Sequence, residues 1–201
     1  MDVGPETVPL LDLNKLLNSS RFMTAAETED ELGCVLRIHL CLESFLEEFL
    51  KNFVQADHKK YHKDRLSFSE KLSLAVAYDL PLSIAEPIQV VNRLRNRCAH
   101  AGDSPLESQL ANMLADQVDL IEFPGKDNKF TVKKTYVEFC VGRPGEKLKF
   151  GENGPRIDFL LVSSYLLANA SRWLVTEYMN RFPCAMVHDA ALNTAEGHIP
   201  C

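Results

Sequence analysis

The sequence predicts a mainly α-helical bundle that carries one small β-hairpin insertion around residues 128–151. Apolar residues recur at helical spacing in several long segments, and turn residues separate these segments. One intervening stretch alternates instead and is rich in β-forming residues. A length of 201 residues, with 46% hydrophobic and 25% charged residues, is typical of one ordinary globular domain. We therefore expect a single domain that spans residues 1–201.

The chain is expected to begin with an N-terminal arm, residues 1–20. Residues 1–9 contain prolines and are expected to be loose or extended. Residues 10–17 are apolar enough for a short helix, which residues 18–20 (Asn-Ser-Ser) would end. The helical core is therefore expected to occupy residues 24–120.

A long amphipathic helix should open this core. Thr24 can cap it, and Glu27 stands three residues later, which is the spacing of a capping box. The helix is expected to reach about Val54, because it contains no proline and only one glycine, Gly33. On its apolar stripe lies His39, for which a hydrogen-bonded core position is a simpler interpretation than a ligand. The stripe consists of Leu32, Val35, Leu36, His39, Leu42, Leu46, Phe49, Leu50 and Phe53.

Two further helices should follow. Ser67 or Ser69 can cap the second, and residues 79–81, which include a proline, should end it. The third helix is expected to have residues 86–87 (Glu-Pro) in its first turn, where proline is tolerated. Gly102 provides its C-terminal stop.

Residues 121–156 form a basic, β-rich insertion. Residues 136–141 and 147–150 alternate, and residues 143–146 between them read as a turn, so we predict a β-hairpin. Residues 126–156 contain eight Lys or Arg against four Asp or Glu. A solvated hairpin edge kept soluble by lysines explains this charge without a function, and a flap that faces a nucleic acid is the alternative.

Helices should flank the insertion on both sides. Residues 104–105 (Ser-Pro) should start a helix that continues through about Leu120. A final core helix is expected over residues 157–180, and its wide apolar surface places it at the centre or at a subunit interface. The tail, residues 183–201, is weakly patterned.

The functional interpretation depends on residues 90–100 of the third helix. In this stretch, three arginines, two asparagines and one histidine stand between apolar residues. At roughly 100° per residue, the apolar residues share one face of the helix. That face consists of Ile84, Ile88, Val91, Leu94, Cys98 and Ala101. The opposite side consists of Asn92, Arg93, Asn96, Arg97 and His100.

Arg95 departs from this pattern, because its direction lies on the apolar face between those of Ile84 and Ile88. A guanidinium in that position is costly unless a carboxylate or a phosphate pairs with it. Either Arg95 has a buried structural partner, or this face opens into a cleft. Glu43, beside the stripe of the first long helix, is the candidate partner; a solvated helix flank is the alternative explanation for Glu43.

Residues 95–100, with an asparagine directly after the arginine, fit the R-x4-6-H pattern of the HEPN superfamily. Three helices follow one another in an order that resembles bacterial HEPN-like proteins. They are the long helix with residues 42–47, the helix with residues 68–72, and the motif helix. More distantly, this order is similar to the mannitol operon repressor family. The resemblance covers about residues 24–120 and implies a HEPN-like helical bundle. Many HEPN proteins are dimeric, metal-independent ribonucleases of toxin–antitoxin, phage-defence and CRISPR systems, whereas others are non-catalytic modules.

The resemblance also implies a set of catalytic residues. Arg95 would stabilise the phosphate, Asn96 would position the reacting groups, and His100 would perform acid–base work. Glu43 would orient Arg95, an assignment that rests on its place in the first long helix.

The spacing of the motif calls for a second copy of the chain. Arg95 and His100 are five residues apart, so they point roughly 140° apart on an ideal helix and cannot converge well within it. A two-fold dimer would place two motifs across a shared cleft, as in HEPN ribonucleases. Arg93 and Arg97 would then contact the backbone phosphates of single-stranded RNA. This mechanism needs neither a metal nor a cofactor, and it leaves a 2′,3′-cyclic phosphate or a 3′-phosphate.

Two functional interpretations stay open. The chain is a metal-independent endoribonuclease or RNA-binding protein of a bacterial defence or toxin–antitoxin type system, or it is a non-catalytic dimeric regulatory or protein-interaction module that keeps the motif for structure. The expected partners are a second copy of the chain, single-stranded RNA or tRNA, and an antitoxin or regulatory protein. A net charge of −6 argues against broad nucleic-acid binding but is compatible with a local basic cleft.

The protein is expected to be cytoplasmic, with no membrane-spanning segment and no metal site. The N-terminus has no cationic and then apolar leader. No apolar run approaches the ~20 residues needed to cross a bilayer. The six cysteines form no C-x-x-C pair, so we expect free thiols in a reducing compartment.

Overall fold

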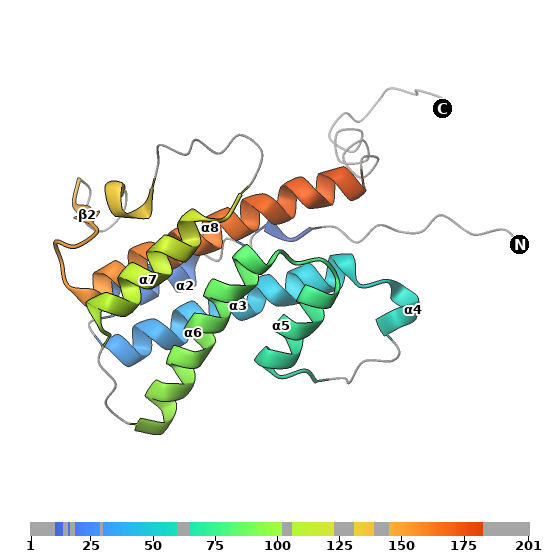
Figure 1. Cartoon of the computed structure of the whole chain (residues 1–201), viewed down its shortest axis with the longest axis horizontal. Helices are drawn as coiled ribbons and strands as arrows, with labels where there is room; N and C mark the ends of the chain where they lie inside the picture. Colours follow the sequence, from blue (N-terminus) through green and yellow to red (C-terminus); the bar gives the residue numbers. More distant parts are fainter. Residues whose placement is uncertain are drawn as a thin grey trace, which may run out of the picture.

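The computed structural model is a helical bundle with one small antiparallel sheet, which confirms the predicted fold class (Figure 1). It describes residues 11–13, 16, 19–28, 30–59, 65–101, 106–122, 131–138 and 145–182. The helices are α2 (Ser19–Glu27), α3 (Glu31–Phe53), α4 (Ala56–Lys59), α5 (Phe68–Ala77), α6 (Leu82–Ala101), α7 (Ser108–Asp119) and α8 (Pro155–Arg181). A short 3-10 helix, η1 (Val132–Lys134), precedes the strands β1 (Tyr136–Glu138) and β2 (Lys147–Lys149).

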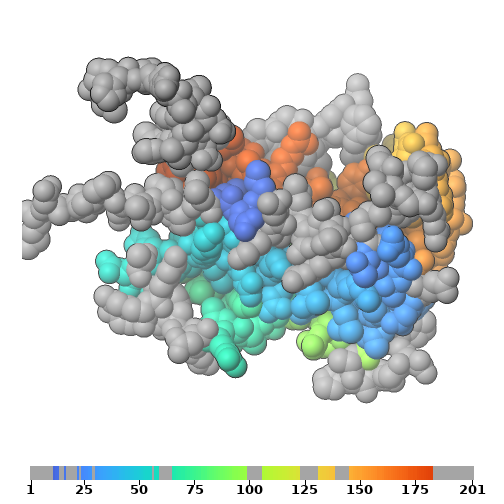
Figure 2. Space-filling model, turned by 180° about the vertical axis from the view of Figure 1, so that it is seen from behind, coloured from blue at the N-terminus to red at the C-terminus, as the bar shows by residue number. Residues whose placement is uncertain are grey.

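Helix α3 forms the centre of the bundle, because α2, α5, α6 and α8 all pack against it. Its buried apolar residues meet those of the other helices in one continuous core. The largest fully buried side chains of α3 are Leu42, Phe45, Leu46 and Phe49. Another part of its surface is visible from behind the molecule (Figure 2). Burial of this amphipathic stripe stabilises α3 more than its helix propensity does.

The start of α3 differs from the sequence prediction, whereas its end agrees. Asp30 caps the helix, since its carboxylate accepts hydrogen bonds from the backbone N–H groups of Leu32 (3.1 Å) and Gly33 (2.7 Å). The expected cap, Thr24, lies inside α2 instead. The helix ends at Phe53, directly before the predicted limit at Val54.

Part of the predicted N-terminal arm packs onto the core. Leu16 is fully buried, and the backbone N–H of Asp12 donates to Oε1 of Glu48 at 2.9 Å. The same oxygen accepts hydrogen bonds from Lys51 (3.2 Å) and Asn52 (3.0 Å). A buried carboxylate is stable when such donors surround it, so Glu48 fixes the arm to α3. The expected loose segment, residues 1–9, lies outside the described residues.

Helices α5 and α6 carry the motif region and largely follow the prediction. Ser67 caps α5 in a complete capping box: its Oγ accepts from the backbone N–H of Glu70, whose carboxylate accepts from the N–H of Ser67. Helix α6 begins at Leu82, earlier than expected, so Pro87 lies beyond the first turn. It ends at Ala101, directly before the predicted stop at Gly102, which lies outside the described residues.

The hairpin is present where the sequence predicted it. Its strands are antiparallel, with Tyr136 opposite Lys149 and Val137 opposite Leu148. The inward pair packs on α8 with Ile157 and Leu161, which forms a small second cluster. The residues between 138 and 145 lie outside the described part.

Helices α7 and α8 flank the hairpin. Helix α7 begins at Ser108 rather than at residues 104–105, which lie outside the described residues. Helix α8 begins at Pro155, close to the predicted start at residue 157. The predicted tail, residues 183–201, lies outside the described residues.

Among the described residues, no helix combines the length and the apolar character needed to cross a membrane.

We expect Ser67→Ala to lower the free energy of unfolding by about 1 kcal/mol, because it removes the N-cap of α5. Urea unfolding followed by circular dichroism measures this change. Ser73→Ala, at an exposed position of the same helix, is the matched control and should change stability little. Equal effects of the two substitutions would contradict the importance of the cap.

Candidate functional site

The predicted site residues lie on the C-terminal half of α6. Figure 1 shows this half projecting past the edge of the bundle. Arg93, Asn96 and Arg97 are exposed there, and Arg95 is partly buried. His100 lies in the last turn of α6, as predicted, and its side chain lies outside the described part of the structure.

Arg95 and Asn96 contact each other. Nη1 of Arg95 donates a hydrogen bond to Oδ1 of Asn96 at 3.2 Å. Nε of Arg95 is buried and has no hydrogen-bond partner among the described residues. A buried guanidinium N–H without a partner is costly. The structure thus joins two of the three predicted catalytic side chains in one polar contact.

Glu43 does not pair with Arg95, so this prediction was wrong. Its carboxylate accepts a hydrogen bond from Nζ of Lys71 on α5 at 2.8 Å, and Lys71 also bonds to Glu47. Helix α5 packs against α3 and brings this ammonium group to both carboxylates. Burial alone would lower the pKa of Lys71, but its hydrogen bonds to Glu43 and Glu47 raise that pKa above its ordinary value. Two carboxylates therefore share one lysine, and Arg95 receives no compensating charge from them.

His39 is a core histidine with hydrogen-bonded surroundings, as predicted. It is 7% exposed, and its ring stacks on Phe68 with a centroid distance of 4.1 Å. Its Nε2 lies 3.2 Å from Oδ1 of Asn92, whose Nδ2 donates to Oγ of Ser69 at 3.2 Å. Because the amide nitrogen of Asn92 serves Ser69, its oxygen faces His39, and Nε2–H of His39 is the donor. This chain of bonds connects α3, α6 and α5.

Asn92 is a structural residue that the sequence placed on the polar side of α6. In the structure it is 4% exposed. The missed signal is its spacing, since Asn92 stands four residues after Ile88 and eight after Ile84. Its bonds to His39 and Ser69 fix the rotation of α6 and direct the exposed arginines away from the core.

The arginines of α6 carry charge that the described residues do not neutralise. Arg93, Arg95 and Arg97 form no ion pair with a carboxylate in that part of the chain. Three positive charges within five residues create a local positive field on an acidic protein.

The basic insertion behaves differently from α6. Lys147 pairs with Glu138 across the hairpin at 3.7 Å, and Lys149 pairs with Glu152 at 3.5 Å. Arg156 donates to the backbone oxygen of Thr28 at 2.7 Å. Most of the described basic residues of the insertion thus have local partners, which favours a solvated hairpin edge over a flap that faces a nucleic acid.

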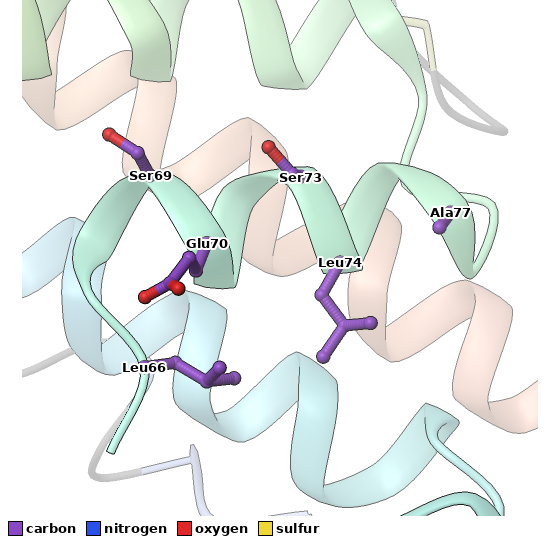
Figure 3. Close-up of a pocket in the computed structure, with 6 residues that line it drawn as sticks. All are labelled: Leu66, Ser69, Glu70, Ser73, Leu74 and Ala77. Carbon is purple, nitrogen blue, oxygen red and sulfur yellow. The ribbon is translucent and has the colours of Figure 1, made fainter. Parts of the chain in front are cut away.

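A shallow depression of about 440 Å³ lies beside the motif helix, on α5. Figure 3 shows Leu66 and Leu74 pointing to one side of α5, and Ser69 and Ser73 to the other. One of its lining residues, Ser69, accepts a hydrogen bond from Asn92 of α6, and the residues that line the depression include no arginine of α6.

No family model matches this chain, and the comparisons with curated proteins and with solved structures find no similar protein.

Within the described residues, no group of three or more His, Cys, Asp or Glu side chains is placed to hold a metal ion. Cys34, Cys41 and Cys98 are buried cysteines, and burial raises the pKa of Cys34 to about 11. The polar side chains described on this half of α6 include Arg93, Arg95, Asn96 and Arg97.

The stability of the protein should fall below about pH 6.5 because of His39. Burial lowers the pKa of His39, and the positive charge of Arg95 acts in the same direction, while the Asn92 bond and Glu43 oppose them. The unfolded chain then binds a proton that the folded protein does not, so stability is present above the unfolded pKa of about 6.5 and is lost as the pH falls toward the folded value.

His39→Gln should reduce this pH dependence while keeping a donor for Asn92. The slope that His39 contributes is at most about 1.4 kcal/mol per pH unit. Urea unfolding between pH 7 and pH 5 tests the slope in both proteins, and NMR titration gives the pKa of His39 directly. A His39 pKa above the ordinary value would refute the assignment.

Proposed function

We propose that the C-terminal half of α6 binds the phosphates of single-stranded RNA and, in a two-fold dimer, cleaves the RNA without a metal ion. The observation that carries this proposal is the group of three arginines that no described carboxylate neutralises, with Arg95 in contact with Asn96. A guanidinium presents N–H donors in a planar fork that matches phosphate oxygens. The HEPN-like motif of residues 95–100 gives the proposal its reaction type.

The proposed reaction uses the ribose as the nucleophile. A general base removes the proton of the 2′-hydroxyl, the 2′-oxygen forms a bond to phosphorus, and the bond from phosphorus to the 5′-oxygen breaks. A general acid gives a proton to that leaving oxygen, which yields a 2′,3′-cyclic phosphate and a 5′-hydroxyl. Arg95 stabilises the negative charge on the phosphorane, and Asn96 holds Arg95 in place.

Two copies of His100 supply the acid and the base. The motif of one chain has one histidine, and the reaction needs two proton transfers on opposite sides of the phosphate. His100 lies in the last turn of α6. A two-fold dimer would bring a second His100 to the same cleft.

The second candidate is a non-catalytic dimeric module that binds RNA or a regulatory protein such as an antitoxin. The specific observation in its favour is the use of Asn92 for structure, since among the described residues this polar residue of α6 bonds to His39 and Ser69. In such a module, the arginines would recognise an anionic partner without chemistry. For both candidates, we also propose a bacterial defence or toxin–antitoxin system as the setting and tRNA as a target.

Cleavage of single-stranded RNA and tRNA in EDTA tests the first candidate. We expect the purified protein to cleave at least one of these RNAs, and Arg95→Ala and His100→Ala to slow cleavage by about 100-fold or more. Arg172→Ala, an exposed arginine on α8, is the control and should keep full activity. Mass spectrometry should find cyclic phosphate ends. Binding without any cleavage by well-folded protein would favour the second candidate.

The salt dependence of RNA binding tests the arginine face independently of cleavage. Arg93→Ala and Arg97→Ala should each weaken binding and reduce the slope of log K against log salt by roughly 0.7. Fluorescence anisotropy with labelled oligouridylate measures both quantities. Arg172→Ala should leave the slope unchanged, and an unaltered slope in the α6 variants would contradict phosphate binding by this helix.

A further inference from the structure

A buried histidine lies between the core and the arginines of α6. His39 of α3 is 7% exposed, and its ring stacks on Phe68 of α5 with a centroid distance of 4.1 Å. Its Nε2 lies 3.2 Å from Oδ1 of Asn92, so the imidazole contacts α6 directly. The proposed function assigns this imidazole no role, although histidine is the side chain that ordinarily gains or loses a proton near neutral pH.

Arg95 belongs to the same turn of α6 as the residue that contacts this ring. Asn92, which bonds to His39, and Arg95 are three residues apart, and this spacing makes them neighbours on the surface of a helix. Arg95 is partly buried, so water screens its charge less than it screens the charge of an exposed arginine. No carboxylate in the described part of the chain forms an ion pair with Arg95. Its positive charge therefore acts on the imidazole without local compensation.

Charged groups from three helices determine whether His39 holds a proton. Burial lowers the pKa of His39, and the bond to Asn92 opposes this effect. Arg95 of α6 and Lys71 of α5 also lower this pKa, whereas Glu43 of α3 raises it. Lys71 and Glu43 are paired at 2.8 Å, so their effects on the ring oppose each other. Arg95 is thus the charge near His39 that no described carboxylate offsets.

We propose that His39 takes up a proton when a phosphate binds at Arg95, so that the arginine face of α6 (Arg93, Arg95 and Arg97) binds RNA more tightly as the pH falls. The coupling rests on the proposed function, because it takes a phosphate to be the ligand of Arg95. The negative charge of a bound phosphate offsets the charge of Arg95, which removes one cause that keeps the imidazole neutral. Binding free energies are linked reciprocally, so a proton on His39 strengthens phosphate binding by the same factor.

The coupling requires no movement of α6. Nε2–H of His39 donates to Asn92 when the ring is neutral, and it donates in the same way when Nδ1 also carries a proton. The bond from Asn92 to Ser69 then stays intact, and α6 keeps its rotation on α3. The proton and the phosphate therefore act on each other through charge alone.

The direction of the pH dependence follows from comparing the free protein with the complex. The pKa of His39 lies below its ordinary value in the free protein, and it rises toward that value in the complex. At pH values between these two pKa values, the complex holds more protons than the free protein does. The contribution of His39 to RNA affinity therefore grows as the pH falls below about 6.5, and it becomes constant below the pKa of the free protein.

NMR titration of the histidine rings tests the coupling in the wild-type protein. The probe is 2′-O-methyl oligouridylate, which lacks the nucleophilic hydroxyl and so is not cleaved. We expect a saturating amount to raise the pKa of His39 by about 0.5 or more, which corresponds to a roughly threefold gain in affinity on protonation. His39→Gln identifies the signal of this ring, and His58, which bonds to Tyr78 at 2.8 Å, is the control ring and should keep its pKa. A His39 pKa that bound RNA leaves unchanged or lowers overturns the inference.

Removal of the Arg95 charge tests the same coupling without RNA. Arg95→Gln should raise the pKa of His39 in the free protein by about 0.5 or more, and the RNA probe should then raise it much less than in the wild type. Arg172→Gln, at an exposed position of α8, is the matched control and should leave the pKa of His39 unchanged. Circular dichroism shows whether each variant keeps the fold. A His39 pKa that is the same in well-folded Arg95→Gln and in the wild type contradicts the coupling, and if this variant does not fold, the wild-type titration alone decides.

The outcomes separate this inference from the proposed function. RNA binding that leaves the pKa of His39 unchanged keeps the proposed function and overturns the coupling. If the protein does not bind the RNA probe, the RNA function is contradicted, and inorganic pyrophosphate then takes the place of RNA as the anion. A rise in the pKa of His39 with pyrophosphate supports the coupling, and the absence of a rise overturns it.

Discussion

The burial of one face of α3 is the interaction on which the rest of the molecule depends. Four helices pack on that single surface, and their apolar side chains meet in one core. Three polar contacts then join other segments to α3: the arm through Glu48, α5 through Lys71, and α6 through Asn92. Polar contacts of this kind add little net free energy, but they select one rotation and one register for each helix, since a shifted helix would leave buried donors without acceptors.

The candidate site is a product of that selection. Helix α6 has polar residues on more than one side, so its own sequence does not decide which of them face solvent. The bonds from Asn92 to His39 and Ser69 orient the helix, which leaves Arg93 and Arg97 exposed and Arg95 partly buried. The orientation of the surface that we propose for RNA binding therefore depends on the buried amide of Asn92.

Sequence patterns predicted the elements of this fold but not their mutual contacts. The stripe of α3, the capping box at Ser67 and the alternation of the hairpin are local signals, and the structure bears them out. The start of α3 was missed because Thr24 and Asp30 are both good caps, and only tertiary packing separates α2 from α3. The partner of Glu43 was missed for a related reason: an ion pair between helices depends on how α5 lies on α3, which periodicity does not encode.

The attachment of the arm has a consequence for how the chain can be shortened. One carboxylate oxygen of Glu48, almost fully buried, accepts hydrogen bonds from Asp12, Lys51 and Asn52. A chain that began at residue 19 would retain every helix from α2 to α8, yet it would open the space filled by Leu16 and remove one donor from a charge that has no solvent around it. Water would have to enter the bundle there to solvate the carboxylate. Asp12 and Leu16, which precede α2, thus help to keep water out of the bundle.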